Sequence, residues 1–301
     1  MHALVALIRL GRPLFLGGGF LLYGLGAAIA AAHGHPIDLR RYVLGQLAVT
    51  AFQLMTHYAN EYFDLEADRS NTTPTRWSGG SRVLVAGELP PRVALIAALV
   101  LAALGAIVSL VLVRGTGARI GVTLVAMAVL AWEYSAPPLR LCATGAGELD
   151  TALVVTGLVP WLGFALQAPD LDGLRTLVLA IVPLALLQLA MLLAIELPDA
   201  AGDAATGKRT LVVRLGAPAA ARLYAALTIA AYVWLPIATL LGLPVRVALV
   251  TAIPAPLALF RVVRMLAEHR DPAAFERVTF FAVFLLVATS ACALVSFTLT
   301  G

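Results

Sequence analysis

Long runs of apolar residues alternate with short polar segments along the whole chain. Windows of about 20 residues, the length that crosses a bilayer core as a helix, pick out nine such runs. Their approximate ranges are 13–32, 42–61, 92–113, 118–137, 149–168, 175–197, 221–242, 245–265 and 277–299. None of them alternates between polar and apolar positions as a barrel strand does. The pattern predicts a bundle of about nine transmembrane helices.

The composition agrees with this pattern. Of the 301 residues, 61% are hydrophobic and 13% are charged, whereas soluble domains average roughly 45 to 50% and about 25%. We therefore expect an all-α, polytopic membrane protein that forms a single membrane-embedded domain over residues 1–301.

The basic residues predict the orientation. We place the amino terminus on the same side as the loops after the second, fourth, sixth and eighth helices. Of the 21 Lys and Arg, the opposite side then holds only Arg40, Arg41, Arg114, Arg119, Arg175 and Arg246. The positive-inside rule assigns the more basic side to the cytoplasm. Of the 17 Asp and Glu, only Asp38, Asp170 and Asp172 lie on the far side, so the carboxylates gather on the predicted cytoplasmic face.

Oxygen-bearing side chains near this face, most of them carboxylates, form two regularly spaced sets. The first set is Asn60, Asp64 and Asp68, and the second is Glu196, Asp199 and Asp203. Steps of three or four residues keep side chains near one face of a helix. Carboxylates stacked near lipid repel one another unless a cation or free access of water neutralises them. Mg²⁺ prefers oxygen ligands and commonly joins carboxylates to substrate phosphates, so the sets predict Mg²⁺ ions around a diphosphate.

The segments that follow each set support a phosphate ligand. "SGGSRVLVAGEL" follows Asp68 and "TGKRTLVVRLG" follows Asp203, and each combines glycine with basic residues. Arg82, Lys208 and Arg209 are candidate donors to phosphate oxygens, and the simpler alternative is that they are orientation charges. His57 lies one turn before Asn60 on the same face, near enough to be a ligand. Its simpler interpretation is a hydrogen-bonded polar residue inside the bundle.

Together these motifs resemble those of the UbiA superfamily of intramembrane prenyltransferases. "NEYFDLEAD" is similar to the NxxxDxxxD motif after the family's second helix, and "DAAGDAATGKRTLVVRLG" contains the DxxxD motif that follows the sixth. "YSAPPLRLCATGAGEL" is similar to the segment between the fourth and fifth helices. The resemblance implies a central cavity with a cytoplasmic cap, and transfer of a polyprenyl group from its diphosphate to an acceptor, with Mg²⁺ as cofactor.

Carried over to this chain, the resemblance assigns catalytic and metal-binding roles to both motifs. The residues concerned are Asn60, Asp64, Asp68, Asp199 and Asp203. Candidates for substrate binding are Arg82, Lys208, Arg209, Tyr134, Arg140 and Glu196. Glu196 departs from similar relatives, which often carry Asn there, and it or Asp203 is a candidate base for the acceptor.

The acceptor remains open at this point. The runs "GKRTLVVRLG" and "ANEYFD" resemble the branch that acts on 1,4-dihydroxy-2-naphthoate in menaquinone synthesis, in a bacterial-type inner (plasma) membrane with the active site toward the cytoplasm. Other branches use 4-hydroxybenzoate, homogentisate, chlorophyllide, haem or a glycerol phosphate lipid. A cation-coupled transporter is a separate alternative, but it would place charges nearer the bilayer midplane. We expect membrane lipid, and no nucleic acid, as further partners.

Overall fold

The computed structural model describes residues 2–299, and within that range every regular element is a helix. The longer helices are α2 (Pro13–Ala32), α3 (Leu39–Phe63), α5 (Pro91–Val113), α6 (Ala118–Glu133), α9 (Leu174–Glu196), α12 (Ala217–Leu240), α14 (Ala255–Glu268) and α15 (Phe275–Thr298). The shorter ones are α1 (His2–Leu10), α4 (Leu65–Ser70), η1 (Leu141–Ala143), α7 (Gly147–Thr151), η2 (Ala152–Leu158), α8 (Val159–Ala165), α10 (Ala200–Ala205), α11 (Leu211–Leu215), α13 (Val245–Thr251) and η3 (Pro272–Ala274).

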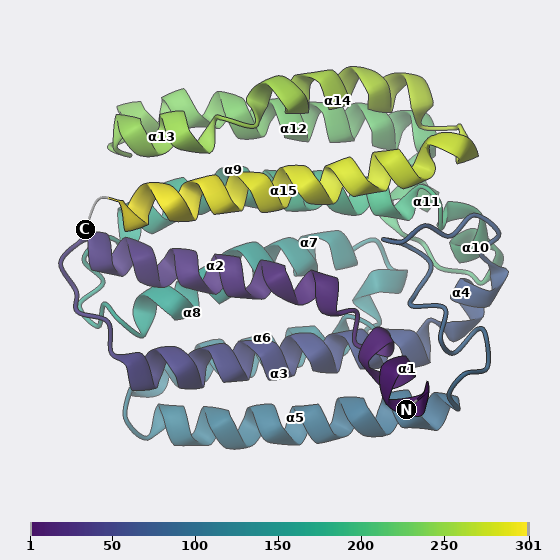
Figure 1. Cartoon of the computed structure of the whole chain (residues 1–301), viewed down its shortest axis with the longest axis horizontal. Helices are drawn as coiled ribbons and strands as arrows, with labels where there is room; N and C mark the ends of the chain where they lie inside the picture. Colours follow the sequence, from purple (N-terminus) through teal and green to yellow (C-terminus); the bar gives the residue numbers. More distant parts are fainter. Residues whose placement is uncertain (1, 300–301) are drawn as a thin grey trace.

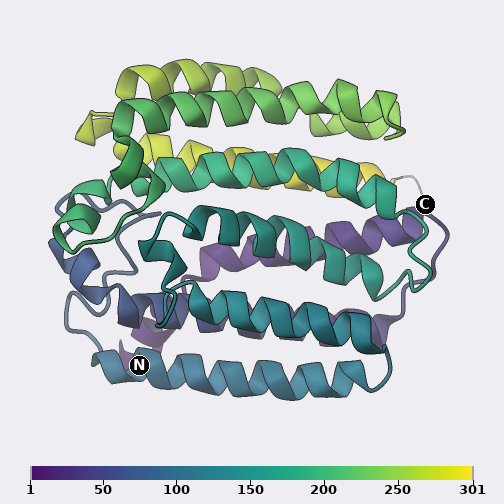
Figure 2. The ribbon, with the colours of Figure 1, turned by 180° about the vertical axis from the view of Figure 1, so that it is seen from behind.

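The long helices run side by side as a bundle, and the short helices α4, α10 and α11 gather at one end of it (Figure 1). The view from behind shows the same gathering of short elements and loops at that end (Figure 2). Within the bundle α3 packs on α5, α9 packs on α12, and α2 packs on α8. The fold therefore confirms the predicted all-helical bundle and gives it a cap at one end.

The predicted number of nine membrane spans is not confirmed. Within residues 2–299, six helices are long and apolar enough to cross a membrane, or seven if the bent pair α13 and α14 forms one span. Helix α6 is only 16 residues long. Helix α3 carries Gln46, Gln53 and His57 in its middle, and these lower its hydropathy. Helices still occupy the predicted ranges, but length and apolarity alone do not make each of them a span.

Prolines and a π-helical stretch interrupt several of the helices. The chain bends by 43° between α13 and α14, where Pro254 precedes the first residue of α14. A second interruption is η2, a π-helical segment that joins α7 to α8, with Pro160 in the first turn of α8. Proline lacks the backbone N–H that a helix interior requires, so breaks at such positions are expected.

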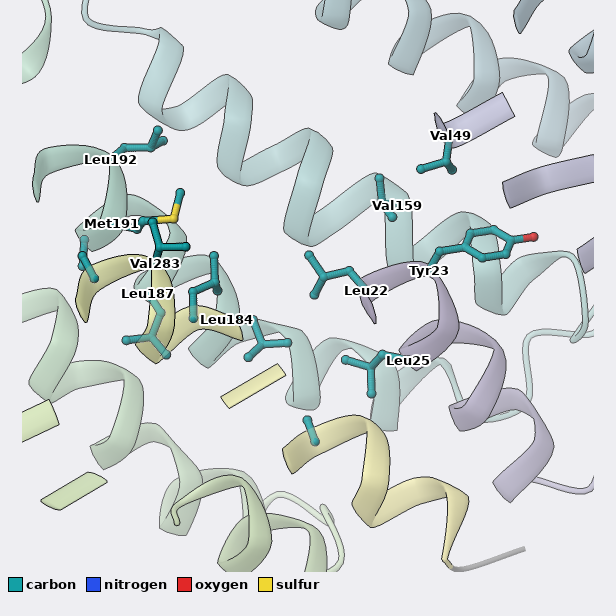
Figure 3. Packing of buried hydrophobic residues seen from close by; sticks show 14 of the residues in the cluster. Leu22, Tyr23, Leu25, Val49, Val159, Leu184, Leu187, Met191, Leu192 and Val283 are labelled. Atoms are coloured by element: carbon teal, nitrogen blue, oxygen red, sulfur yellow. The ribbon is translucent and has the colours of Figure 1, made fainter. Parts of the chain in front are cut away.

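The core fills the space between the long helices with apolar side chains. Figure 3 shows residues from α2, α9 and α15 meeting there, among them Leu22, Leu187 and Val283. Close contact between α2 and α8 requires glycine, since a Cβ on Gly26 would strike the carbonyl oxygen of Pro160. The outer face of α5 instead exposes large apolar side chains such as Ile107 and Leu110. Lipid is the solvent in which such a face is stable.

Candidate active site

A polar cavity of about 90 Å³ lies at the capped end of the bundle. Its walls come from the end of α3, from α4, from the loop before α5, and from the segment running from the end of α9 to Thr210. Arg12 before α2, Tyr134 after α6 and Cys142 in η1 complete them. The predicted site residues in its lining are Asn60, Asp64, Asp68, Tyr134, Glu196, Asp199, Asp203 and Lys208. Motifs more than 100 residues apart in the sequence thus face one small space.

The first motif spans a break between two helices. Helix α3 ends at Phe63 and α4 begins at Leu65, but the backbone N–H groups of Asp64 and Asp68 still bond to carbonyls four residues earlier, at 2.8 and 2.9 Å. This bonding preserves the helical spacing that the sequence predicted. The side chain of Asn60 donates to Asp64 Oδ2 at 2.7 Å and to Ser135 Oγ at 3.1 Å.

The second motif lies across the cavity on α10 and the turn before it. Asp199 precedes α10, and its Oδ1 accepts a hydrogen bond from Asn71 Nδ2 at 2.6 Å. Its Oδ2 accepts from the backbone N–H of Gly79 at 3.0 Å. Both donors belong to the loop that follows the first motif, so Asp199 ties the two halves of the site together.

Lys208 connects the two motifs directly. Its Nζ lies 3.0 Å from Asp64 Oδ2 and 3.1 Å from Asp203 Oδ1. Burial alone would lower the pKa of this ammonium group, but the two carboxylates outweigh burial and raise the pKa above its ordinary value. A permanently charged ammonium group in this position can pair with anions brought into the cavity.

The remaining carboxylates of the cavity have few cationic partners. Burial raises the pKa of Asp68 to about 7, and nearby carboxylates add to that shift while Arg12 opposes it. Burial, with the neighbouring Asp203, likewise raises the pKa of Asp199 to about 6. Among residues 2–299 no group of three or more His, Cys, Asp and Glu is already arranged around a common metal position. The crowded acids nevertheless suit a hard divalent cation, which would stabilise their charged forms.

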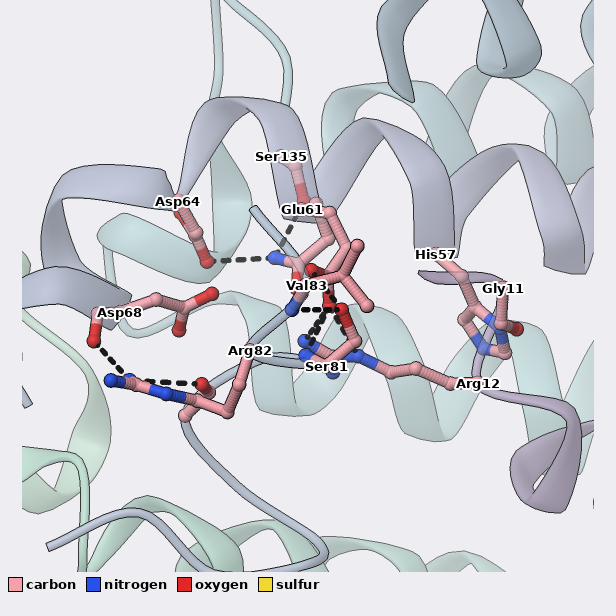
Figure 4. A network of polar contacts seen from close by, with 12 residues as sticks. Gly11, Arg12, His57, Glu61, Asp64, Asp68, Ser81, Arg82, Val83 and Ser135 are labelled. Carbon is pink, nitrogen blue, oxygen red and sulfur yellow. Dashed lines mark hydrogen bonds and ion pairs between the residues drawn. The ribbon is translucent and has the colours of Figure 1, made fainter. Parts of the chain in front are cut away.

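A network around Glu61 is a feature that the sequence did not reveal (Figure 4). Glu61 is 2% exposed and accepts hydrogen bonds from Arg12 Nε at 2.8 Å and from Ser81 N and Oγ, both at 2.6 Å. Arg12 Nη2 also lies 2.7 Å from Glu61 Oε1. The network holds the Arg12 guanidinium in the wall of the cavity, although Arg12 had only the appearance of an orientation charge.

Two glycines shape the loop that closes the cavity. Gly79 and Gly80 both have φ of 71°, a conformation that L side chains rarely adopt. A Cβ on Gly80 would also collide with the carboxylate of Asp68. These glycines therefore let the backbone approach the first motif closely. Close approach of this loop to an anion stays a prediction.

Three predicted phosphate contacts lie outside the cavity lining. Arg82 donates to the backbone carbonyls of Asp68 and Gly79, so its guanidinium supports the loop. Arg140 and Arg209 are exposed. Their roles remain predictions, but in this structure the cationic side chains in the cavity wall are Arg12 and Lys208.

His57 has the simpler of its two interpretations. Its Nδ1 lies 2.8 Å from the backbone carbonyl oxygen of Gly11 (Figure 4). The ring is thus hydrogen-bonded inside the bundle.

Some residues that line the polar cavity could not be found from the sequence, because they match no motif spacing. They are Asn71, Ser78, Cys142 and Thr210.

An apolar cavity of about 230 Å³ adjoins the polar one. Side chains of α2, α3, η2, α9 and α15 line it. Six residues line both cavities, and they mark the junction between them: Arg12, Asn60, Trp77, Tyr134, Leu192 and Ile195. The arrangement offers a charged end for an anionic group and an apolar continuation for a hydrocarbon chain.

The fold and the paired cavities define a class of intramembrane enzyme. The model of the UbiA prenyltransferase family matches residues 20–295, and the chain belongs to this family of membrane prenyltransferases. A 1,4-dihydroxy-2-naphthoate octaprenyltransferase of Bacillus subtilis is 26% identical over 229 residues, which cover 75% of this chain and 71% of that protein.

Solved structures share the fold over nearly the full length. A digeranylgeranylglyceryl phosphate synthase superposes with a TM-score of 0.67 and 18% identity, covering 99% of both chains. A UbiA homologue from Archaeoglobus fulgidus bound to GPP and Mg²⁺ has a TM-score of 0.64 and 16% identity, covering 96% of this chain and 99% of its own. An apo UbiA homologue from Aeropyrum pernix K1 has a TM-score of 0.65 and 17% identity, covering 93% and 97%.

Proposed function

We propose that this prenyltransferase moves a polyprenyl group from its diphosphate to 1,4-dihydroxy-2-naphthoate, with Mg²⁺, in menaquinone synthesis. The observation that carries the proposal is the junction of the two cavities. Both aspartate motifs line the polar cavity, and that cavity continues into an apolar one. A prenyl diphosphate has the same division into a charged head and an apolar tail.

The comparisons support two parts of this proposal. The naphthoate octaprenyltransferase of Bacillus subtilis supports the acceptor. The Archaeoglobus fulgidus homologue was solved with GPP and Mg²⁺ and also with DMAPP and Mg²⁺, which supports the diphosphate and the metal. We extend both features to this chain as part of the proposal.

The residues that would hold Mg²⁺ are those of the two motifs, Asn60, Asp64, Asp68, Asp199 and Asp203. Their fit to a hard cation rests on burial, to which neighbouring carboxylates add, and both effects raise the pKa of Asp68 and of Asp199. Bound Mg²⁺ neutralises charge on a diphosphate and so favours its departure from an allylic carbon.

The protein's own groups would act around that departure. Lys208 and Arg12 would donate to phosphate oxygens, because charged donors form stronger hydrogen bonds to phosphate than neutral donors do. The apolar cavity would keep water from the reacting carbon. Glu196 lines the polar cavity on the side of the second motif, where it would contact the acceptor or take its proton.

The test is an activity assay with purified protein in detergent. Labelled polyprenyl diphosphates are incubated with a panel of acceptors, with Mg²⁺ or with a chelator. We expect product with 1,4-dihydroxy-2-naphthoate and its loss with the chelator. If product forms only with a different acceptor, that acceptor replaces 1,4-dihydroxy-2-naphthoate in the proposal. If no acceptor gives product and the protein conducts ions in liposomes, a transporter is favoured.

We also propose that the chain forms one membrane-embedded domain with the capped end toward the cytoplasm of a bacterial-type cell. The distribution of basic residues supports this orientation. Labelling of single cysteines introduced at exposed positions such as Arg209 and Arg114, with a reagent that does not cross membranes, tests it. If the cysteine at position 114 is labelled only from the cytoplasmic side, the orientation is the opposite of the one proposed.

A further inference from the structure

Trp77 carries a buried hydrogen-bond donor for which residues 2–299 provide no acceptor. Its indole Nε1 is buried without a partner. By contrast, Nε1 of Trp161 donates to Thr123 Oγ1 at 2.9 Å, and Nε1 of Trp234 donates to the carbonyl oxygen of Leu179 at 3.0 Å. Trp77 Nε1 is one of twelve buried side-chain N and O atoms without a partner among residues 2–299. Buried polar groups are usually paired, so each exception, Trp77 among them, requires an explanation. Because an indole N–H can only donate, its partner must be an acceptor such as oxygen.

The position of Trp77 suggests what that partner is. Trp77 lines both the polar and the apolar cavity, so it lies at their junction. Its ring packs edge to face on Phe15, with ring centroids 5.7 Å apart, and Phe15 also lines the apolar cavity. It also approaches Phe280 of α15, at 6.1 Å between centroids, and Phe280 is 42% exposed. The indole thus contacts aromatic rings of α2 and α15 at the junction of the cavities.

Hydrogen bonds hold the Trp77 loop against α15. The backbone N–H of Trp77 donates to Thr75 Oγ1 at 3.1 Å, and Thr279 of α15 donates to the same oxygen at 3.3 Å. The backbone N–H of Arg76 donates to Glu276 Oε2 at 3.0 Å. The indole is therefore held in place before a ligand arrives, which reduces the entropic cost of binding.

We propose that Trp77 binds the aromatic acceptor and helps to select it. The N–H donates to a carboxylate or hydroxyl oxygen of the acceptor, and the indole and its aromatic neighbours pack against the acceptor ring. The diphosphate already has Lys208 and Arg12 as cationic donors in the polar cavity. The indole N–H donor lies among aromatic rings, and such surroundings suit an aromatic molecule with an oxygen substituent. This inference rests on the proposed function.

The test compares Trp77→Phe with the matched control Trp234→Phe. Steady-state rates with 1,4-dihydroxy-2-naphthoate, geranyl diphosphate and Mg²⁺ give a separate KM for each substrate. In Trp77→Phe we expect the KM for the acceptor to rise on the order of ten-fold, as for loss of one hydrogen bond to a charged group. The KM for geranyl diphosphate should stay within about two-fold, and Trp234→Phe should leave both KM values near wild type.

The failures of the two proposals are distinguishable. If the wild-type protein forms no product, the proposed function fails. If the wild type is active but the acceptor KM of Trp77→Phe matches that of Trp234→Phe, or only the diphosphate KM rises, the role of Trp77 is overturned. Trp77→His keeps a ring N–H, so we expect it to retain an acceptor KM closer to wild type, and it carries the test if Trp77→Phe does not fold.

A second acceptor identifies the oxygen that the indole contacts. Naphthalene-1,4-diol lacks the carboxylate of the naphthoate. If the N–H pairs with the carboxylate, Trp77→Phe should have little effect on the KM for the diol, because the interaction is already lost. An equal effect on both acceptors assigns the hydrogen bond to a hydroxyl oxygen. Either result supports acceptor binding, whereas no effect on either acceptor contradicts it.

Discussion

Replacement of Glu61 by Gln should destabilise the protein far more than the same change at an exposed glutamate. Glu61 is 2% exposed and pairs with Arg12, whose side chain is 22% exposed. It also accepts two hydrogen bonds from Ser81. Glutamine would remove the charge that neutralises Arg12 and would turn an N–H₂ group toward donors.

The size of the effect follows from this burial. Removing one partner of a buried ion pair costs about 3 to 5 kcal/mol, because the other charge is left uncompensated. Arg12 retains some access to solvent, so we take the lower end, about 3 kcal/mol. At roughly 2 °C per kcal/mol for a chain of this size, the expected loss is about 6 °C in Tm.

The assay is thermal unfolding of the purified variant in detergent, with Glu66→Gln as the control. Glu66 pairs with Arg69 at 2.6 Å, but its side chain is 75% exposed, so that substitution should change Tm by no more than about 1 °C. We also expect the diphosphate KM of Glu61→Gln to rise, since Glu61 positions the Arg12 guanidinium. Equal Tm values for the two variants would refute the reasoning.

Three further predictions concern the cavity itself. Asp64→Ala and Asp199→Ala should each abolish prenyl transfer, because each removes a proposed metal ligand. Tm should fall in both variants, since Lys208 loses one carboxylate partner in the first and Asn71 and Gly79 lose their acceptor in the second. Retained turnover in either variant would count against its metal role. Glu196→Asn should change acceptor preference, measured with the acceptor panel, more than it changes the diphosphate KM. A larger change in the diphosphate KM than in acceptor preference would instead indicate that Glu196 belongs to the metal site. Gly80→Ala should lower kcat at least ten-fold, because its Cβ would displace the Asp68 carboxylate and its φ of 71° is strained for alanine. The control is Gly87→Ala, which has the same φ but open space around its Cβ. Similar kcat values in both variants would contradict the prediction.

The sequence was most informative where chemistry depends on local spacing. Steps of four residues from Asn60 to Asp68 were readable as one face, and the backbone bonds of that segment keep the spacing across the break at Asp64. The apolar runs fixed the all-helical class because a bilayer requires backbone groups to bond within their own segment. The exact number of spans was less readable, since α6 is short and α3 carries polar residues inside the bundle.

The sequence was least informative where function depends on residues brought together from distant segments. Arg12 and Glu61 are separated by 49 positions, and nothing in their spacing predicts an ion pair. Trp77 reads as one aromatic residue in a polar loop, and its unpaired N–H is visible only when its surroundings are known. Conversely, Arg140 and Arg209 had the right charge and the right neighbours in sequence, but their side chains are exposed.

By itself the sequence determined the helical bundle, its membrane setting and the two aspartate motifs, because hydropathy and helical periodicity are properties of neighbouring residues. Only the tertiary structure decided that both motifs share a cavity, that Lys208 bridges them, and that this cavity continues into an apolar one. The physical reason is that ion pairs, cavities and unsatisfied donors depend on distances between segments, and the packing of the helices sets those distances.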